Sequence, residues 1–370
     1  MSGMSVIRRN FIDLPINYSL NYYWCSGFVL SGFIVMQIAT GILLSFIYIA
    51  DSTSSFYIIS SISNDSFYSW CVRYWHLWGV TLIFLLLFVH LGRALYYSSY
   101  SKKGVWNIGF LLYLLMMVEA FTGYVLPWHQ MSYWAATVLT SIINSVPVVG
   151  PTLFMYIVGG FSVNSDTLVR MFSVHVCLGF IILGLMVLHL FYLHLVGSNN
   201  PLCLVSFSDV VFFHCYYTVK DFMVFLSSVI IIICCLMLCP DLLLGVDSFL
   251  EANSMSTPVS IKPEWYFLMF FSMLRCIESK VGGITLILSF LFFMWVPTSN
   301  YSSAYFIYRQ LIFWAIVCSF LVLTYFGSCH PEYPYLLICR VFSVLSVTFM
   351  FIFKLFWVDS RKLFLLYSND

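Results

Sequence analysis

Charged residues are scarce in this sequence: Asp, Glu, Lys and Arg make up 8% of 370 residues, while 62% are hydrophobic. Soluble domains carry about 25% charged residues, so this balance excludes an ordinary water-soluble protein. The net charge of +1 and the lack of a basic cluster argue against a nucleic-acid partner. We therefore expect the chain to be embedded in a lipid bilayer.

Two further signals are missing. The twelve cysteines include no Cys-x-x-Cys pair, which argues against c-type haem attachment and against a common zinc or iron–sulfur framework. No short apolar stretch with a small-residue cleavage site precedes the first long apolar run, so we expect no removable targeting segment.

Long apolar runs, in contrast, recur along the whole chain. A helix needs about 20 residues to cross a hydrocarbon core of about 30 Å. The sequence predicts an all-α membrane protein with eight transmembrane helices, over about 27–50, 75–97, 107–126, 172–196, 221–239, 282–298, 311–327 and 335–357. An even number of spans places both chain ends on one side, and basic residues are commoner there, as expected for the side of synthesis.

Four histidines lie inside these spans, in two pairs with the same spacing. His76 and His90 are 14 residues apart on the second span, as are His175 and His189 on the fourth. Fourteen residues return to the same helix face within about 40° and rise about 21 Å. If the two spans are antiparallel neighbours, we expect His76 to face His175 and His90 to face His189, giving two bis-imidazole haem sites stacked across the membrane.

Glycines repeat the histidine spacing. Gly27 and Gly41 on the first span, and Gly109 and Gly123 on the third, are also 14 residues apart. A planar macrocycle between helices needs room that side chains would fill, so these glycines are expected to line the haem sites.

Three arginines lie three to five residues from these histidines: Arg73, Arg93 and Arg170. Haem propionates near a membrane surface need cationic partners, so we expect these arginines to bind them.

The polar stretch at 197–201 divides the chain into two predicted parts. Residues 1–200 would form a haem-binding four-helix bundle, and residues 201–370 a C-terminal group of four helices. Long connections at about 127–170 and 240–281 lie on the side away from the chain ends, and we expect a pocket there.

With these pairs established, the chain resembles mitochondrial cytochrome b of complex III over nearly its whole length. The resemblance implies a low-potential haem b at His76 and His175, near the positive side, and a high-potential haem b at His90 and His189, near the matrix. The motifs that carry it are Trp106-Asn107-Ile108-Gly109, Gly123-Tyr124-Val125-Leu126-Pro127-Trp128, Gly197-Ser198-Asn199-Asn200-Pro201, Tyr216-Tyr217-Thr218-Val219-Lys220-Asp221 and Lys262-Pro263-Glu264-Trp265-Tyr266.

The resemblance also implies two quinone sites. The segment with Glu264 and Tyr266, in the connection at 240–281, would line the quinol oxidation site, where Glu264 accepts a proton; alternatively, Glu264 caps a surface helix. His194, Ser198 and Asp221 would form the quinone reduction site on the opposite face.

The resemblance further implies the partners and the location. The chain would belong to a dimeric multi-subunit complex with a Rieske-type iron–sulfur protein and a cytochrome c-type subunit, and its substrate would be ubiquinol. It would be a multi-pass protein of the mitochondrial inner membrane with both ends in the matrix. Its many Phe, Tyr and Cys residues resemble those of a divergent protist such as a kinetoplastid.

Four residues depart from the family pattern. Glu119 is a carboxylate inside a span, His129 and Ala135 stand where glycine is usual, and Cys25 replaces a polar residue. An intramembrane carboxylate is costly and usually functional. The competing hypothesis is therefore a transporter or proton relay that uses the intramembrane histidines and Glu119. It leaves the repeated spacing of 14 unexplained.

Overall fold

A computed structural model of the chain describes residues 5, 8–202, 209–298 and 304–355. Within them, seven helices are long and apolar enough to cross a membrane. The eighth expected span is the helix α11, Lys280–Trp295, which is apolar but has only 16 residues. The last two residues of the final predicted span, 356 and 357, lie outside the described part. The prediction of an all-α membrane protein is confirmed.

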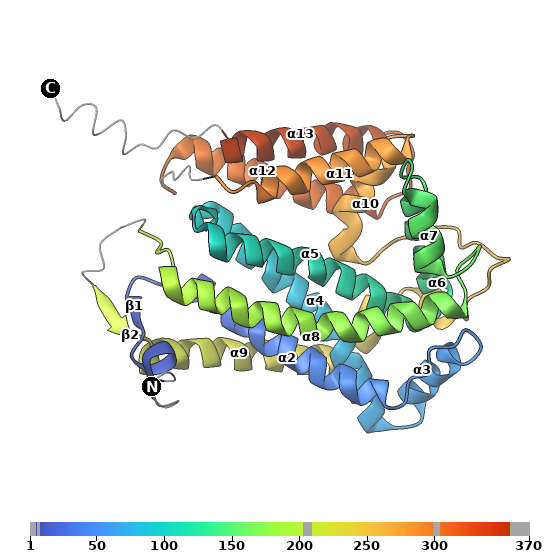
Figure 1. Cartoon of the computed structure of the whole chain (residues 1–370), viewed down its shortest axis with the longest axis horizontal. Coiled ribbons are helices and arrows are strands. Elements are labelled where there is room, and N and C mark those ends of the chain that lie inside the picture. Colours follow the sequence, from blue (N-terminus) through green and yellow to red (C-terminus); the bar gives the residue numbers. More distant parts are fainter. Residues whose placement is uncertain (1–4, 6–7, 203–208, 299–303, 356–370) are drawn as a thin grey trace.

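The long helices lie roughly side by side (Figure 1). α2 (Ser26–Ser45) packs against α4 (Phe67–Tyr96), and α5 (Lys103–Val125) packs against α8 (Ser165–Val196). α9 (Phe213–Leu238) lies against α2 and α4, so the fifth long helix accompanies the first four in space. A second group contains α10 (Leu268–Arg275), α11, α12 (Ile307–Gly327) and α13 (Tyr335–Leu355). The division of the chain at residue 200 stays a prediction.

Several helices begin before their apolar runs do. α4 starts eight residues before the predicted span, where Ser66 caps it by accepting a hydrogen bond from the backbone N–H of Ser69. α8 starts seven residues early, at a capping box formed by Asn164 and Thr167. Polar caps mark the ends of helices, whereas hydropathy marks only the part that crosses the hydrocarbon core.

Short elements cover the two ends of the long helices. α3 (Ser55–Asn64), α6 (Gln130–Asn144) and α7 (Gly150–Val158) gather at the right of Figure 1. The N-terminal π-helix Arg8–Ile12 and the two-stranded antiparallel sheet of β1 (Pro15–Asn17) and β2 (Val210–Phe212) lie at the opposite end. Short 3-10 helices occupy Tyr22–Cys25, Ser99–Ser101, Pro240–Leu243, Val246–Phe249 and Trp265–Phe267.

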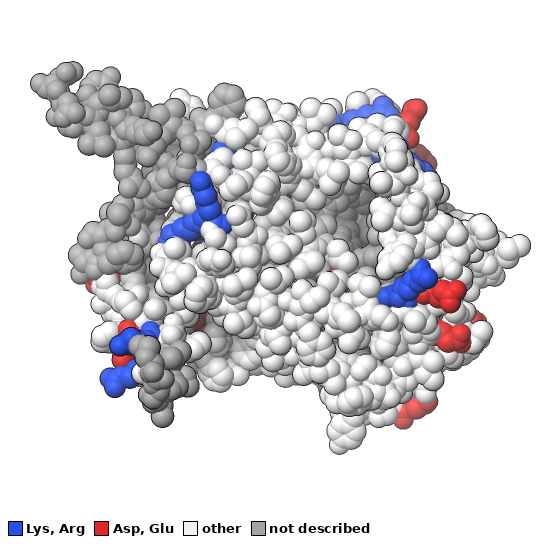
Figure 2. Space-filling model, in the orientation of Figure 1, with Lys and Arg blue, Asp and Glu red and all other residues white. Residues whose placement is uncertain are grey.

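Charged side chains gather at these two ends, and a wide uncharged band separates them on the visible face (Figure 2). Such a band is what a bilayer-spanning protein presents to lipid. Hydrogen bonds to backbone carbonyls join the helix groups at two places. The buried Arg309 donates to the carbonyls of Leu95 and Tyr96 at the end of α4. The indole N–H of Trp106 donates to the carbonyl of Trp295 at 2.8 Å, which ties α5 to α11.

Candidate functional site

The four intramembrane histidines face one another in two pairs. The ring centres of His76 and His175 are 6.3 Å apart, and those of His90 and His189 are 6.4 Å apart. An imidazole nitrogen lies about 1.1 Å from its ring centre and about 2 Å from a bound transition metal, so two imidazoles on opposite sides of one metal hold their centres about 6 Å apart. Both gaps therefore fit a bis-imidazole metal, as in haem ligation.

The reason we gave for this pairing was wrong, although the structure brings the expected residues together. α4 and α8 run in the same direction, because they are two spans apart in the series that alternates across the molecule (Figure 1). Parallel helices bring the first histidine of one next to the first histidine of the other. The antiparallel neighbours are instead α2 with α4 and α5 with α8.

Each of the four glycines lies against one histidine ring. A Cβ atom at Gly27 or Gly41 would stand 3.3 Å from Cε1 of His90 or His76, respectively. At Gly109 and Gly123 the corresponding distances, to Cε1 of His189 and His175, are 2.8 and 2.6 Å. These glycines therefore make room for the imidazole rings. We had expected them to make room for the haem macrocycle instead.

The outer ring nitrogens have partners beside these glycines. Nδ1 of His90 is 3.0 Å from Oγ of Ser26, and Nδ1 of His76 is 2.9 Å from Oγ1 of Thr40. Nδ1 of His175 is 3.0 Å from the carbonyl oxygen of Glu119. Such bonds orient metal-binding imidazoles. Our sequence reasoning missed Ser26 and Thr40. The signal that could have found them is that each is a hydroxyl residue directly before one of the repeated glycines.

The three arginines differ in their surroundings. Arg73 lines a cavity of about 280 Å³ that also contains His76 and His175. Arg93, three residues after His90 on α4, packs over the ring of Trp24. Arg170 instead donates to the carbonyl of Tyr156 near the end of α7. The structure therefore places Arg73 near a histidine pair. Both Arg73 and Arg170 also donate to a surface helix, Arg73 to Ser63 on α3 and Arg170 to the backbone of α7.

A larger cleft of about 810 Å³, almost entirely apolar, opens beside this cavity. It lies between α5, α6, α7, α8 and α10, and Figure 2 shows the hollow next to α7. Ala135 and Arg170 line it, while Glu264 and Tyr124 line both the cleft and the cavity of His76 and His175. Glu264 therefore stands at the boundary between the two spaces.

Glu264 occupies the N-cap position of the 3-10 helix Trp265–Phe267, but its side chain makes no capping hydrogen bond. Burial raises the pKa of this carboxyl to about 7. A carboxyl with such a pKa exchanges protons readily near neutral pH. Tyr266, two residues after Glu264, is buried and stacked on Phe84 with ring centres 4.0 Å apart, and of the two spaces it lines only the smaller cavity.

At the opposite end of the helices, the predicted residues are dispersed over three elements. His194, in the last turn of α8, packs edge-on against Phe11, and Ser198 follows in the connection after α8. Asp221 on α9 is buried next to the thiol of Cys25. All of these elements lie at the end that carries β1 and β2 (Figure 1).

His129 has a structural role that its sequence position did not reveal. It is buried at the N-cap of α6, where its Nδ1 accepts a hydrogen bond of 3.0 Å from the backbone N–H of Ser132. Burial, followed by the charge of Arg73, lowers its pKa to about 3, which keeps the ring neutral and able to accept that bond. Its backbone pairs with Glu251, so it also holds the long connection against α6.

Comparison with known proteins agrees with this architecture. Residues 11–197 match the family model described as cytochrome b/b6/petB, and residues 251–359 match the one described as cytochrome b(C-terminal)/b6/petD. A chain from a solved structure titled "Hyperthermophilic respiratory Complex III" is 24% identical, with 95% of this chain and 96% of that chain covered and a TM-score of 0.89. At this identity, the match demonstrates a shared fold.

The fold and the histidine pairs define a multi-pass membrane protein of the haem-binding electron-transport class. The two family matches make the particular family clear: the chain belongs to the cytochrome b family. Membership implies that it binds b-type haem. Cytochrome b is the catalytic redox subunit of quinol–cytochrome c reductase, and the transporter alternative is not favoured.

Proposed function

We propose that this chain moves electrons across the membrane from a quinol oxidation site beside Glu264 to a quinone reduction site beside His194, and that two haems b are held by His76 with His175 and by His90 with His189. The observation that carries the proposal is the pair of ring separations, 6.3 and 6.4 Å, at two levels of one helix bundle. When bound, haem supplies one-electron carriers to these levels. The resemblance assigns the lower potential to the first pair.

At the quinol oxidation site, the apolar cleft would bind the quinol ring and tail, and Glu264 would accept one of the two protons that quinol loses. Its place between the cleft and the cavity of His76 and His175 supports this role, because a proton acceptor must reach the substrate. One electron would leave to an iron–sulfur protein, and the second would cross the membrane. Tyr266 would help shape the wall between the two spaces.

At the quinone reduction site, His194, Ser198 and Asp221 would hydrogen-bond the quinone and deliver protons to it. Their common location at the end with β1 and β2 supports the assignment. Arg73, Arg93 and Arg170 were expected to bind propionates, and the position of Arg73 in the cavity of His76 supports that role best.

The resemblance to mitochondrial cytochrome b supports a specific membrane, orientation and set of partner subunits. The chain would lie in the mitochondrial inner membrane with both ends in the matrix. It would work in a dimeric complex with a Rieske-type iron–sulfur protein and a cytochrome c-type subunit, and use ubiquinol as substrate.

An optical spectrum of the purified native complex tests the proposal. Dithionite-reduced minus oxidised difference spectra should contain two b-type α-bands, one of which is reduced by quinol when the oxidation site is blocked. A complex with a single b-type band would contradict the two-site assignment, and a colourless protein would favour the transporter or proton-relay reading.

A further inference from the structure

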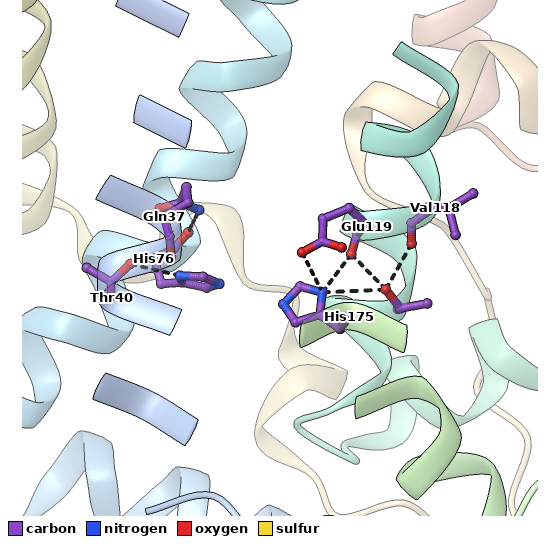
Figure 3. A network of polar contacts seen from close by, with 7 residues as sticks. Gln37, Thr40, His76, Val118, Glu119 and His175 are labelled. Carbon is purple, nitrogen blue, oxygen red and sulfur yellow. Dashed lines mark hydrogen bonds and ion pairs between the residues drawn. The ribbon is translucent and has the colours of Figure 1, made fainter. Parts of the chain in front are cut away.

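Glu119 lies on α5, one helical turn before Gly123, and its carboxyl extends toward the gap between His76 and His175 (Figure 3). Its Oε1 atom is 3.2 Å from Nδ1 of His175. The same ring nitrogen is 3.0 Å from the carbonyl oxygen of Glu119 and 3.4 Å from Oγ1 of Thr122. The Nδ1–H of His175 therefore faces a carboxylate in addition to the backbone oxygen.

The other three histidines have no acid in the equivalent position. The residues four places before the repeated glycines are Tyr23, Gln37, Val105 and Glu119. Gln37 donates to the backbone carbonyl of His76 at 2.7 Å and does not touch the ring nitrogen. The ring of His189 has the backbone of Val105 as its partner, as His175 has the backbone of Glu119, but Val105 carries no acidic side chain. The carboxylate thus distinguishes one histidine of the four.

The carboxyl of Glu119 has no cationic side chain as a partner among the described residues, and its Oε2 atom accepts no hydrogen bond there. A half-buried carboxyl whose inner oxygen accepts no hydrogen bond is costly, so packing alone does not account for it. A carboxyl that accepts a hydrogen bond from the outer nitrogen of a ligand imidazole makes the imidazole a stronger donor to the metal. Stronger donation stabilises the oxidised metal more than the reduced metal.

We propose that Glu119 is a potential-setting residue: its carboxyl accepts the Nδ1–H of His175 and lowers the midpoint potential of the haem held by His76 and His175. The effect is confined to that haem, because the carboxyl of Glu119 lies against the ring of His175 and lines the cavity that also contains His76. This inference rests on the proposed ligation by His175.

The test is a redox titration of both b-type α-bands in the purified complex with Glu119→Leu and Glu119→Gln. Leu removes the acceptor, so the midpoint potential of the positive-side haem should rise; a tenfold change in its reduction equilibrium is about 59 mV. Gln keeps one acceptor oxygen, so its shift should be smaller and of the same sign. The low-spin ferric electron paramagnetic resonance signal of that haem should change with the potential, because it reports the imidazole ligand field.

Val105→Leu is the matched control, because Val105 holds the same place relative to His189 and its side chain carries no hydrogen-bond acceptor. It should leave both potentials unchanged. An unmoved positive-side potential in both Glu119 variants, or equal shifts of the two haems, would overturn the proposal. His175→Ala separates this failure from failure of the proposed function: if both bands survive in that variant, His175 is not a ligand and the site assignment itself is wrong.

Discussion

Replacing the repeated glycines with alanine should remove haem in a graded and site-specific way. At Gly123 the new Cβ would stand 2.6 Å from Cε1, 3.2 Å from Nδ1 and 3.3 Å from Nε2 of His175. At Gly41 the nearest atom, Cε1 of His76, would be 3.3 Å away. Ordinary carbon contacts lie at about 3.5–4.0 Å, so the first contact is short by about 0.9 Å and the second by only about 0.2 Å.

The overlap at Gly123 must displace the imidazole, because the Cβ is fixed to the helix and the ring centre lies only 6.3 Å from its partner's. Overpacking of this kind costs about 1–3 kcal/mol. Each 1.4 kcal/mol is about tenfold in affinity, so haem binding at this pair should weaken by about 5- to 150-fold. The small overlap at Gly41 can be absorbed by tenths of an ångström of ring movement, with little loss.

The assay is haem content per complex, measured from the two α-bands in membranes that carry Gly123→Ala, Gly109→Ala, Gly41→Ala or Gly27→Ala. We expect the band of the haem assigned to His76 and His175 to fall in the first variant, and that of the haem assigned to His90 and His189 in the second, where the Cβ would be 2.8 Å from His189. The last two variants should retain most of their haem. Equal losses in all four, or loss of the opposite band, would refute the view that each glycine accommodates its own imidazole.

Three further predictions concern a proposed haem ligand, the proposed proton acceptor and the wall of the apolar cleft. His189→Ala should abolish the band of the haem assigned to His90 and His189 and leave the other band in place, because the two sites use separate ligand pairs; a protein that loses only the other band would disprove the pairing. Because a base must be deprotonated to accept a proton, quinol oxidation should accelerate as pH rises through the Glu264 pKa of about 7. Glu264→Gln should lower the rate and flatten the rise in rate near that pH. An unchanged pH profile would argue against Glu264 as the proton acceptor. The resemblance implies that methoxyacrylate-type inhibitors lie against the cleft wall at Ala135, where the family usually has glycine. Ala135→Gly should therefore tighten their binding by about 5- to 150-fold, for an overpacking cost of about 1–3 kcal/mol, and equal inhibition of both proteins would show that this methyl group does not limit binding.

The sequence by itself determined the membrane class, the number of apolar runs and the two sets of spacings. Each of these is a local property: hydropathy is summed along a run, and a spacing of 14 places residues on one helix face whatever the helix packs against. His76 was expected to face His175, and their rings do lie together, but the reasoning was wrong, because it took α4 and α8 to be antiparallel when they run in the same direction.

The tertiary structure alone decided which side chains those faces meet. Gly123 could not be assigned to the ring of His175 from spacing, because that contact depends on the closeness of α5 and α8. Glu264 lies between two cavities, and Arg170 donates to the carbonyl of Tyr156. Both arrangements depend on contacts between segments that are distant in the sequence. A carboxylate such as Glu119 is conspicuous in the sequence, but only the packing of α5 against α8 reveals that its Oε1 atom lies 3.2 Å from Nδ1 of His175.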